Sequence, residues 1–588
     1  MKKVLLLLSA ALLLALVFVG CASPAPAPAP TPVAAPAPPV ATPGAAPAPQ
    51  EAAAQPQDAA EEDFNETSVI NFTWHGNDGS GFFVNPWRAT QNMHQMMVFE
   101  SLVRRSACGN DYFPYLAASW EVSADGLTYT FQVRDTSVWS DGTPLTMDDV
   151  IFSFARRLVY PVFVPAAFTF IEGAQDVMNG YARYPSGVQA DGWTLTVTLT
   201  QPRIDFMPAV PQLAILPRHL LGHVDNMLEF DRDPFWLNPV GSGPYVIDVV
   251  NPDNFFTVVL RDDYVGAYSP RVRRAVFTDF RVGGTEAVAA AFIAGNLDFA
   301  KGSIVNDLSM ARNVVANNPD VSYKILPSTF VRALMFNMTG STDGSAFNES
   351  ILNPDVRHAL NLLLDKEAIA SMYGDQATVL TTYFSPYSPY FNTDIPLFQR
   401  DVETARALLE AADFDFSLPI RIAYHYTNQA TQDIMAIITA NFAEVGIMTE
   451  PFLMTGDVGG ILHGTRPYEL VYVALSAGQP DVMIGGYANS AATFNANNNI
   501  ILGNVEEREE IFNHIIDAYM SATDNETKMR LRWEMQALAH EHMYVIPKFV
   551  LHRVILLNTA NWEFDEDLFG VDVLFDQDWM YSSWNLLR

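Results

Sequence analysis

Short stretches in which apolar and polar residues alternate recur along the chain from about residue 69. Residues 127–133 (LTYTFQV) place tyrosine, phenylalanine and valine on one side and polar residues on the other, the period of a half-buried strand. Residues 193–199 alternate similarly after the turn pair Asp191-Gly192. Residues 470–475 are apolar throughout, which predicts a strand covered on both faces.

Other segments carry apolar residues three and four positions apart, the period of an amphipathic helix. We expect Asn353 or Asp355 to cap the first of them, and the last to break near residues 523–525. Strands and helices mixed in long blocks predict an α/β architecture of several lobes. The segments are 355–371, 404–411, 434–445 and 506–543.

The chain starts with a different pattern. Lys2 and Lys3 precede a strongly apolar run over residues 4–19, which Gly20-Cys21 ends. A positive start, a short apolar run and a small residue before the cut predict a signal peptide over residues 1–20 rather than a membrane span. The site resembles a lipobox, so we expect lipid on Cys21. An ordinary signal peptide followed by a chance cysteine is the alternative.

Residues 21–65 are predicted to be a linker. Eleven prolines, mixed mainly with alanine, lie between Pro24 and Pro49, a composition that favours extended polyproline II over a core. Residues 50–65 are polar and acidic. This linker would hold the folded body away from a membrane surface.

Charge and cysteine content narrow the function. Without Lys2 and Lys3 the chain has 32 basic against 66 acidic residues, so neither nucleic acid nor an anionic lipid surface is an expected partner. Lipid on Cys21 leaves Cys108 without an intramolecular partner, so the fold must rest on a large core rather than on disulfides.

No catalytic or cofactor motif is found. Gly241-Ser242-Gly243 lacks the spacing of a nucleophile elbow and is neither a dinucleotide fingerprint nor a phosphate loop. His540 and His542 fall on different helix faces, and His219 and His223 have no acidic or cysteine cluster beside them in sequence. We therefore predict no enzyme activity, no cofactor and no metal site.

Several local motifs are structural when taken singly. In residues 137–150, Asp141-Gly142 predicts a hairpin turn, and Thr146 with Asp149 predicts a capping box at the start of a helix. In their order and spacing, however, the motifs resemble the family 5 extracellular solute-binding proteins, the oligopeptide-, dipeptide- and nickel-binding receptors of ABC importers. The motifs are 114–121, 134–150, 238–245, 261–264, 292–298, 356–369, 403–409 and 545–547.

The resemblance implies a two-lobed α/β fold of the periplasmic-binding-protein type II class, with an extra domain inserted in the first lobe. Lobe I would comprise residues 69–110, 239–328 and 552–588, the extra domain 111–238, and lobe II 331–551. The lobes would close over the ligand about a hinge, and the protein would be a monomer.

The resemblance also implies where a ligand binds. Relatives that bind peptides hold them as an added strand. Many of them place an aspartate after the lobe II strand to pair with the ligand's ammonium. Gly478 stands at that position here and Asp481 follows three residues later, so recognition of a free peptide N-terminus is an open question. The implied ligand-binding residues are Ala89, Thr90, Asn92, Ala474, Ser476, Gly478, Asp481 and the pocket-wall candidate Phe549. Asn495 is a further candidate because its amide-rich loop can supply hydrogen bonds to a ligand.

The expected function is therefore a lipid-anchored receptor, on the outer face of the cell membrane, that delivers oligopeptides to an ABC permease. An oligosaccharide receptor on the same scaffold is the alternative, in which the candidates for stacking on sugar rings are Trp74, Trp87, Trp139, Trp193 and Trp236. A surface-tethered hydrolase is a further alternative, for which no nucleophile can be nominated. Cargo identity and length, and the permease itself, stay undetermined.

Overall fold

The computed structural model describes residues 68–74, 85–87, 97–105, 112–160, 164–476, 514–522 and 524–562, with short gaps inside these ranges at 252–253, 268–269, 271, 281–282, 301–306, 329, 383, 385, 388–389, 457, 459, 520 and 561. By their contacts, residues 56–588 form a compact unit that is separate from residues 1–55. Everything described below belongs to the first of these.

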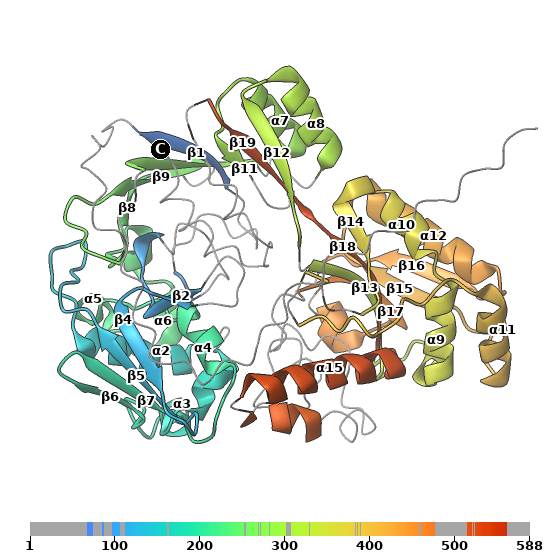
Figure 1. Ribbon diagram of the computed structural model, residues 1–588, viewed down its shortest axis with the longest axis horizontal. Coiled ribbons are helices and arrows are strands. Elements are labelled where there is room, and N and C mark those ends of the chain that lie inside the picture. Colours follow the sequence, from blue (N-terminus) through green and yellow to red (C-terminus); the bar gives the residue numbers. More distant parts are fainter. Residues whose placement is uncertain are drawn as a thin grey trace, which may run out of the picture. The chain divides into compact units, whose positions relative to one another are not determined.

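The largest described sheet has seven strands in the order β12-β19-β11-β1-β10-β9-β8 (Figure 1). Strand β1 runs parallel to β10 and β11, and the remaining pairs are antiparallel. Helices α7 (Gly284–Ile293) and α8 (Leu308–Asn317) bury an apolar cluster against β19 and β12. The strands are β1 Val69–Trp74, β8 Tyr245–Asn251, β9 Phe255–Leu260, β10 Arg274–Asp279, β11 Phe299–Ala300, β12 Val321–Leu326 and β19 Arg553–Asn558.

Two motif residues near this sheet, Arg261 and Gly241, contact segments that are far from them in the sequence. The guanidinium group of Arg261 donates to the backbone carbonyls of residues 138, 139, 241 and 243 and to the carboxylate of Asp263. Gly241 lies so close to Val98 that a Cβ atom there would be 1.9 Å from the Val98 carbonyl oxygen. The glycine is required by this close approach.

The segment between β1 and β8 contains a four-stranded antiparallel sheet, β4-β5-β7-β6. Tyr129, Phe131 and Val133 of β5 are all buried, which confirms the strand predicted from alternation. Helix α2 (Met147–Val159) starts as predicted, because the Asp149 carboxylate accepts the Thr146 N–H at 2.8 Å. The other elements here are β2 Val103–Arg105, β3 Tyr112–Pro114, β4 Ala117–Val122, β5 Thr128–Val133, β6 Val188–Asp191, β7 Thr194–Thr198, α3 Ala174–Met178, α4 Phe206–Ala209, α5 Arg218–Leu221, α6 Met227–Asp231, and the 3-10 turns η1 Ala166–Phe170, η2 Val210–Gln212 and η3 Pro234–Leu237.

Three of the tryptophans considered for sugar stacking lie in the apolar core. Trp87, Trp139 and Trp236 are each at most 4% exposed. Trp87 packs on Phe230 with ring centroids 5.8 Å apart, and Trp236 contacts the same phenylalanine at 5.5 Å. These indoles therefore cannot stack on a ligand in this conformation.

A six-stranded sheet, β14-β18-β13-β17-β15-β16, forms the second large core. Strand β13 is antiparallel to both of its neighbours, while β15 is parallel to β16 and β17. The elements are β13 Phe330–Phe336, β14 Ala377–Val379, β15 Ile420–Tyr424, β16 Thr449–Leu453, β17 Leu470–Ser476, β18 Val545–Leu551, α9 Pro354–Leu363, α10 Lys366–Ser371, α11 Val402–Ala411, α12 Gln429–Ala443, α15 Asn525–His542, the 3-10 turns η4 Glu349–Leu352 and η5 Gly374–Gln376, and the π-helical turn η6 Gly460–Thr465.

One helix prediction needs correction. Residues 355–371 form two helices, because the Asp365 side chain accepts the Ala368 N–H and starts α10 where α9 has ended. Of the two cap candidates, Asn353 caps α9 and Asp355 does not. Helix α12 begins five residues before the predicted 434, and α15 begins after an Asp524 cap, as the predicted break requires.

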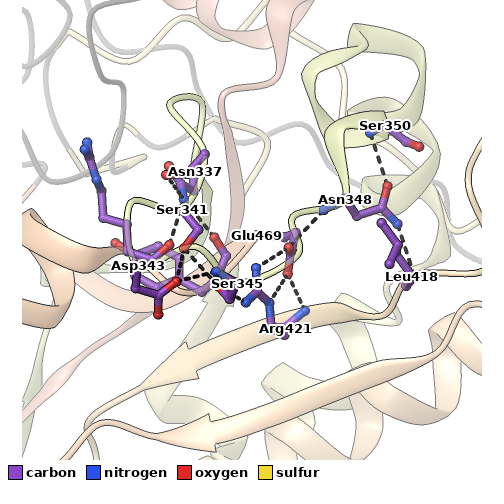
Figure 2. Close-up of polar contacts among 12 residues, drawn as sticks. Asn337, Ser341, Asp343, Ser345, Asn348, Ser350, Leu418, Arg421 and Glu469 are labelled. Atoms are coloured by element: carbon purple, nitrogen blue, oxygen red, sulfur yellow. Dashed lines mark hydrogen bonds and ion pairs between the residues drawn. The ribbon is translucent and has the colours of Figure 1, made fainter.

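A buried polar network fixes the start of β17 (Figure 2). Glu469, with a fully buried side chain, accepts from the Arg421 guanidinium at 2.7 and 3.1 Å, and also from the backbone N–H groups of Arg421 and Asn348. The guanidinium in turn donates to Ser345, which belongs to a turn closed by the Asp343 carboxylate. All four lone-pair positions of Glu469 are thus used within the fold.

The described chain passes between the two large sheets at 327–328 and at His552. His552 joins the crossings, because its Nδ1 accepts the Ser328 N–H at 3.2 Å and its Nε2 lies 2.9 Å from the Thr378 hydroxyl. Its own N–H donates to the Gln376 carbonyl at 2.7 Å. Burial lowers the pKa of His552, which keeps Nδ1 free to accept.

Candidate functional site

Several strands of the six-stranded sheet begin or end at the same end of the sheet, and we call this line of strand ends its edge. Strands β15, β17 and β18 end there and β13 begins there, as the register of their pairing requires. Both crossings to the seven-stranded sheet leave from this same edge. Ligands of open α/β sheets bind beyond strand ends of this kind, so this edge is the candidate site.

Arg332 is the centre of a row of side chains across this edge. It pairs with Ala474 in β17 and with Phe549 in β18. Directly opposed residues of antiparallel strands project to the same face, so two residues predicted from the family motifs flank Arg332. A bulge between Arg332 and Ala333 leaves Lys548 as the extra residue of β18 beside this row. We call Arg332 and Lys548 the basic pair.

Tyrosines surround the basic pair. The Lys548 Nζ atom lies 3.8 Å from the centroid of the Tyr472 ring, and the guanidinium carbon of Arg332 lies 4.5 Å from that of Tyr426. These are cation–π distances. The Tyr426 hydroxyl also accepts the Ala474 N–H at 3.1 Å. On the other side of the row, Tyr373 contacts Phe549 with ring centroids 5.2 Å apart.

Burial dominates the electrostatics of this group. It lowers the pKa of the Lys548 ammonium well below its usual value, and the charges of Arg332 and Lys366 lower that pKa further. Burial likewise lowers the pKa of His425, and Arg332 adds to this shift. For Arg332 burial acts in the same direction but the neighbouring phenols outweigh it, so its pKa is raised and it stays charged.

Strand β17 runs past its neighbour β15 at this edge. The pairing with β15 involves only Leu470 and Val471 of β17, whereas β13 pairs with β17 as far as Ser476. Within the described residues, no strand pairs with 472–476 on the β15 side. The Ala474 N–H on that side is met by the Tyr426 hydroxyl instead. A segment in extended conformation can add to β17 here.

The other predicted binding residues are only partly described. Ser476 pairs through its backbone with Phe330, and nothing is described of its side chain. Phe549 is fully buried, so it supports the row from within rather than presenting a free ring. The remaining residues, Cys21, Ala89, Thr90, Asn92, Gly478, Asp481 and Asn495, lie outside the described residues.

The sequence prediction missed the basic pair. Each of these residues is the one charged side chain of an otherwise apolar strand, in FVRALMF and VIPKFVL. A lone cation within an apolar run was the available signal, because a buried charge of this kind needs a partner. Its neighbours in space come from β17 and the loop after β15, which local patterns do not indicate.

Two further properties concern possible ligands and location. The described part of the chain holds no group of three or more histidine, cysteine, aspartate or glutamate side chains arranged to bind a metal ion. The histidines considered earlier have other neighbours: His219 pairs with Asp141 at 2.9 Å, and His540 stacks on Phe398. Among the helices of the described residues, none has the length and apolar character needed to cross a bilayer.

Comparison with known proteins agrees with the motifs. Residues 111–505 match the model of the bacterial extracellular solute-binding proteins, family 5 Middle. The chain is 25% identical to the heme-binding protein A of Haemophilus influenzae over 491 residues, which covers 79% of this chain and 83% of that protein. It is 24% identical to the dipeptide-binding protein of Escherichia coli over 435 residues, 70% and 76% of the two chains.

Solved structures give the same result for the fold. The oligopeptide-binding protein AppA of Bacillus subtilis, in complex with a nonapeptide, superposes with a TM-score of 0.68 at 17% identity, covering 88% of this chain and 98% of that one. NikZ of Campylobacter jejuni, in complex with Ni(L-His), gives 0.69 at 19% identity over 89% and 99%. The two-lobed α/β fold of type II periplasmic binding proteins is confirmed.

The proteins matched are binding proteins of transporters and not enzymes. Family proteins act outside the cytoplasm, as the family description states. With two thirds of its length matched by the family model, this chain belongs to the bacterial extracellular solute-binding proteins of family 5.

Proposed function

We propose that this protein captures oligopeptides outside the cytoplasm and delivers them, chemically unchanged, to an ABC permease. The observation that carries the proposal is the side of β17 at residues 472–476 with which no described strand pairs. A peptide added there gains main-chain hydrogen bonds that do not depend on its sequence. Relatives that bind a dipeptide and a nonapeptide support this choice of cargo.

The division into domains follows the family pattern and is part of the proposal. Lobe I comprises 69–110, 239–328 and 552–588, with the extra domain 111–238 inserted, and lobe II is 331–551. The four-stranded sheet falls within the proposed extra domain and, apart from Phe330, the six-stranded sheet falls within lobe II, whereas the β2-β3 pair spans the boundary at 110/111. The two crossings at 327–328 and His552 are the proposed hinge.

Anchorage at the outer face of the membrane is a separate element of the proposal. Residues 1–20 direct export, Cys21 carries the lipid, and 21–65 form the spacer. Replacement of Cys21 by alanine should move the protein from the membrane fraction to the soluble fraction of its host. A protein that stays with the membrane after this change would contradict lipid anchorage while leaving peptide capture untouched.

Thermal unfolding with defined ligand pools tests peptide capture. A pool of pentapeptides at 100 times its dissociation constant should stabilise the protein by about 2.7 kcal/mol. Gluco-, manno- and xylo-oligosaccharides at the same concentration should give no shift. The reverse result would favour the oligosaccharide alternative, and cleavage of the peptides during the experiment would favour a hydrolase.

Backbone methylation tests the way the peptide is held. A peptide with N-methyl groups at alternate residues keeps its side chains but loses donors to β17. We expect one N-methylated series to bind at least tenfold more weakly than its parent and the series shifted by one residue to bind nearly as well, because alternate residues of a strand face opposite sides. Equal affinity of all three would contradict strand addition.

A further inference from the structure

We propose that His552 is a proton-sensitive latch of the hinge. As a neutral ring it fastens the two crossings between the large sheets to each other. When the ring takes up a proton it releases them, so that cargo is held less tightly at acidic pH. The latch concerns the proposed hinge, and its effect on cargo rests on the proposed function.

The contacts of the ring determine which nitrogen carries the hydrogen. Nδ1 lies 3.2 Å from the backbone nitrogen of Ser328, which can only donate, so Nδ1 is the acceptor. Nε2 therefore carries the hydrogen of the neutral ring and donates to the Thr378 hydroxyl at 2.9 Å. A second proton would go to Nδ1 and point at the Ser328 N–H. Protonation thus turns an attractive contact between the two crossings into a repulsive one.

Gln376 extends this connection to the other sheet. Its backbone carbonyl accepts the His552 N–H at 2.7 Å, and its side-chain Oε1 accepts the N–H of Leu308, the first residue of α8, at 2.9 Å. The Asp307 carboxylate caps the two N–H groups that follow in α8. Gln376 is 4% exposed and His552 5%, so water competes little for these bonds. A shift of His552 is therefore passed through Gln376 to α8, which packs on the seven-stranded sheet.

The surroundings of the ring favour its neutral form. The Tyr387 ring meets it edge-on with centroids 5.1 Å apart, and the Tyr387 hydroxyl lies 3.4 Å from Nε2. Burial is the one cause of the lowered pKa of His552, so the latched ring takes up a proton only below the ordinary value of 6.5. The other titratable or charged groups on the adjoining elements, none of which contributes to that shift, are Asp307 and Arg312 of α8, Tyr323 and Lys324 of β12, Lys366 and Glu367 of α10, Asp375 of η5, Lys548 of β18 and Arg553 of β19.

Release of the latch weakens cargo binding because closure of the lobes has to order the hinge. Lobes that close about a hinge change the chain conformation at both crossings. While His552 holds the crossings together, they are already ordered, and closure over cargo costs less conformational entropy. Once the ring is protonated, the crossings move independently and closure has to order each of them. The affinity for cargo therefore falls with the pH.

Hydrogen exchange at the Ser328 N–H tests the latch without any ligand. Opening frees a ring with an ordinary pKa near 6.5, so the open state gains up to about thirtyfold between pH 7.5 and pH 5.0. We expect the protection factor of this N–H in the wild type to fall at least fivefold between these pH values. His552→Asn places an acceptor that takes up no proton where Nδ1 was, and its protection factor should stay within twofold. His219→Gln, which alters a histidine paired with Asp141 in α5, should keep the full fall.

Peptide affinity at the same two pH values tests the effect on cargo. We expect the Kd of a pentapeptide pool to rise from pH 7.5 to pH 5.0 at least threefold more for the wild type than for His552→Asn. An equal rise in both proteins would overturn the effect on cargo.

The exchange result decides on the latch itself. A protection factor that does not fall in the wild type, or that falls equally in His552→Asn, would overturn it. If His552→Asn does not fold, His552→Gln takes its place in both comparisons. If no peptide binds at either pH, peptide capture fails, and the exchange result still supports or overturns the latch.

Discussion

Replacement of Glu469 by glutamine tests how the end of lobe II opposite the candidate site is held. The wild-type carboxylate accepts four hydrogen bonds between 2.7 and 3.1 Å, two of them from the Arg421 guanidinium (Figure 2). Glutamine keeps the shape, but its NH2 group faces a donor and Arg421 loses its counter-charge. Removal of one partner of a buried pair costs about 3–5 kcal/mol. Because glutamine still accepts up to two of the four bonds, we expect about 2–4 kcal/mol.

The assay is calorimetric unfolding, because a protein of several domains does not unfold in one two-state step. The transition that contains lobe II should move to lower temperature while the others stay in place. In a double-mutant cycle, Glu469→Gln and Arg421→Met should cost less together than the sum of the two. The control is Glu534→Gln in the exposed Arg530–Glu534 pair at 3.2 Å, expected within about 0.5 kcal/mol. A loss below 1 kcal/mol for Glu469→Gln, or full additivity, would refute the reasoning.

Three further changes have distinct expected outcomes. Gly241→Ala should destabilise the protein by at least about 2 kcal/mol in chemical denaturation, because its Cβ would meet the Val98 carbonyl oxygen. The control is Gly464→Ala, whose Cβ would meet no atom within 4 Å and which should cost under about 1 kcal/mol. Equal effects of the two changes would contradict the packing argument. Arg261→Met should cost about 3–5 kcal/mol, since it leaves buried carbonyls and Asp263 without their donor, and a near-neutral result would contradict its structural role. Burial lowers the pKa of His540 from 6.5 to about 4. Folding stability that is present above pH 6.5 is therefore lost as the pH falls towards 4, by about 1–2 kcal/mol after screening by solvent. His540→Phe should remove this part of the pH dependence of Tm, whereas an unchanged profile would assign it to other groups.

Local patterns predicted those parts of the fold that local physics determines. Alternation in residues 127–133 gave β5 because one face of that strand is buried, and Thr146 with Asp149 marked the start of α2 because capping involves residues three apart. The same reasoning missed the break at Asp365. Apolar residues keep their helical spacing from α9 into α10. The spacing alone therefore gives no sign that Asp365 caps a second helix.

The candidate site was predictable only in outline. Family motifs pointed to Ala474 and Phe549, and the structure places both beside Arg332. Nothing local in FVRALMF indicates that its arginine lies between those two residues, because strand register over long sequence separations is set by the whole sheet. The bulge that brings Lys548 to the row has no sequence signal of its own. A charged residue inside an apolar run was the one indication of a site in the sequence.

The most direct test of the account is native mass spectrometry of the protein purified from its own host without refolding, followed by release and sequencing of whatever it holds. We predict a complex heavier than the bare chain by the mass of short peptides, and those masses should stay unchanged on prolonged incubation. A sugar, a metal complex or a cargo that is cleaved while bound would contradict the claim that this protein captures peptides and passes them on intact.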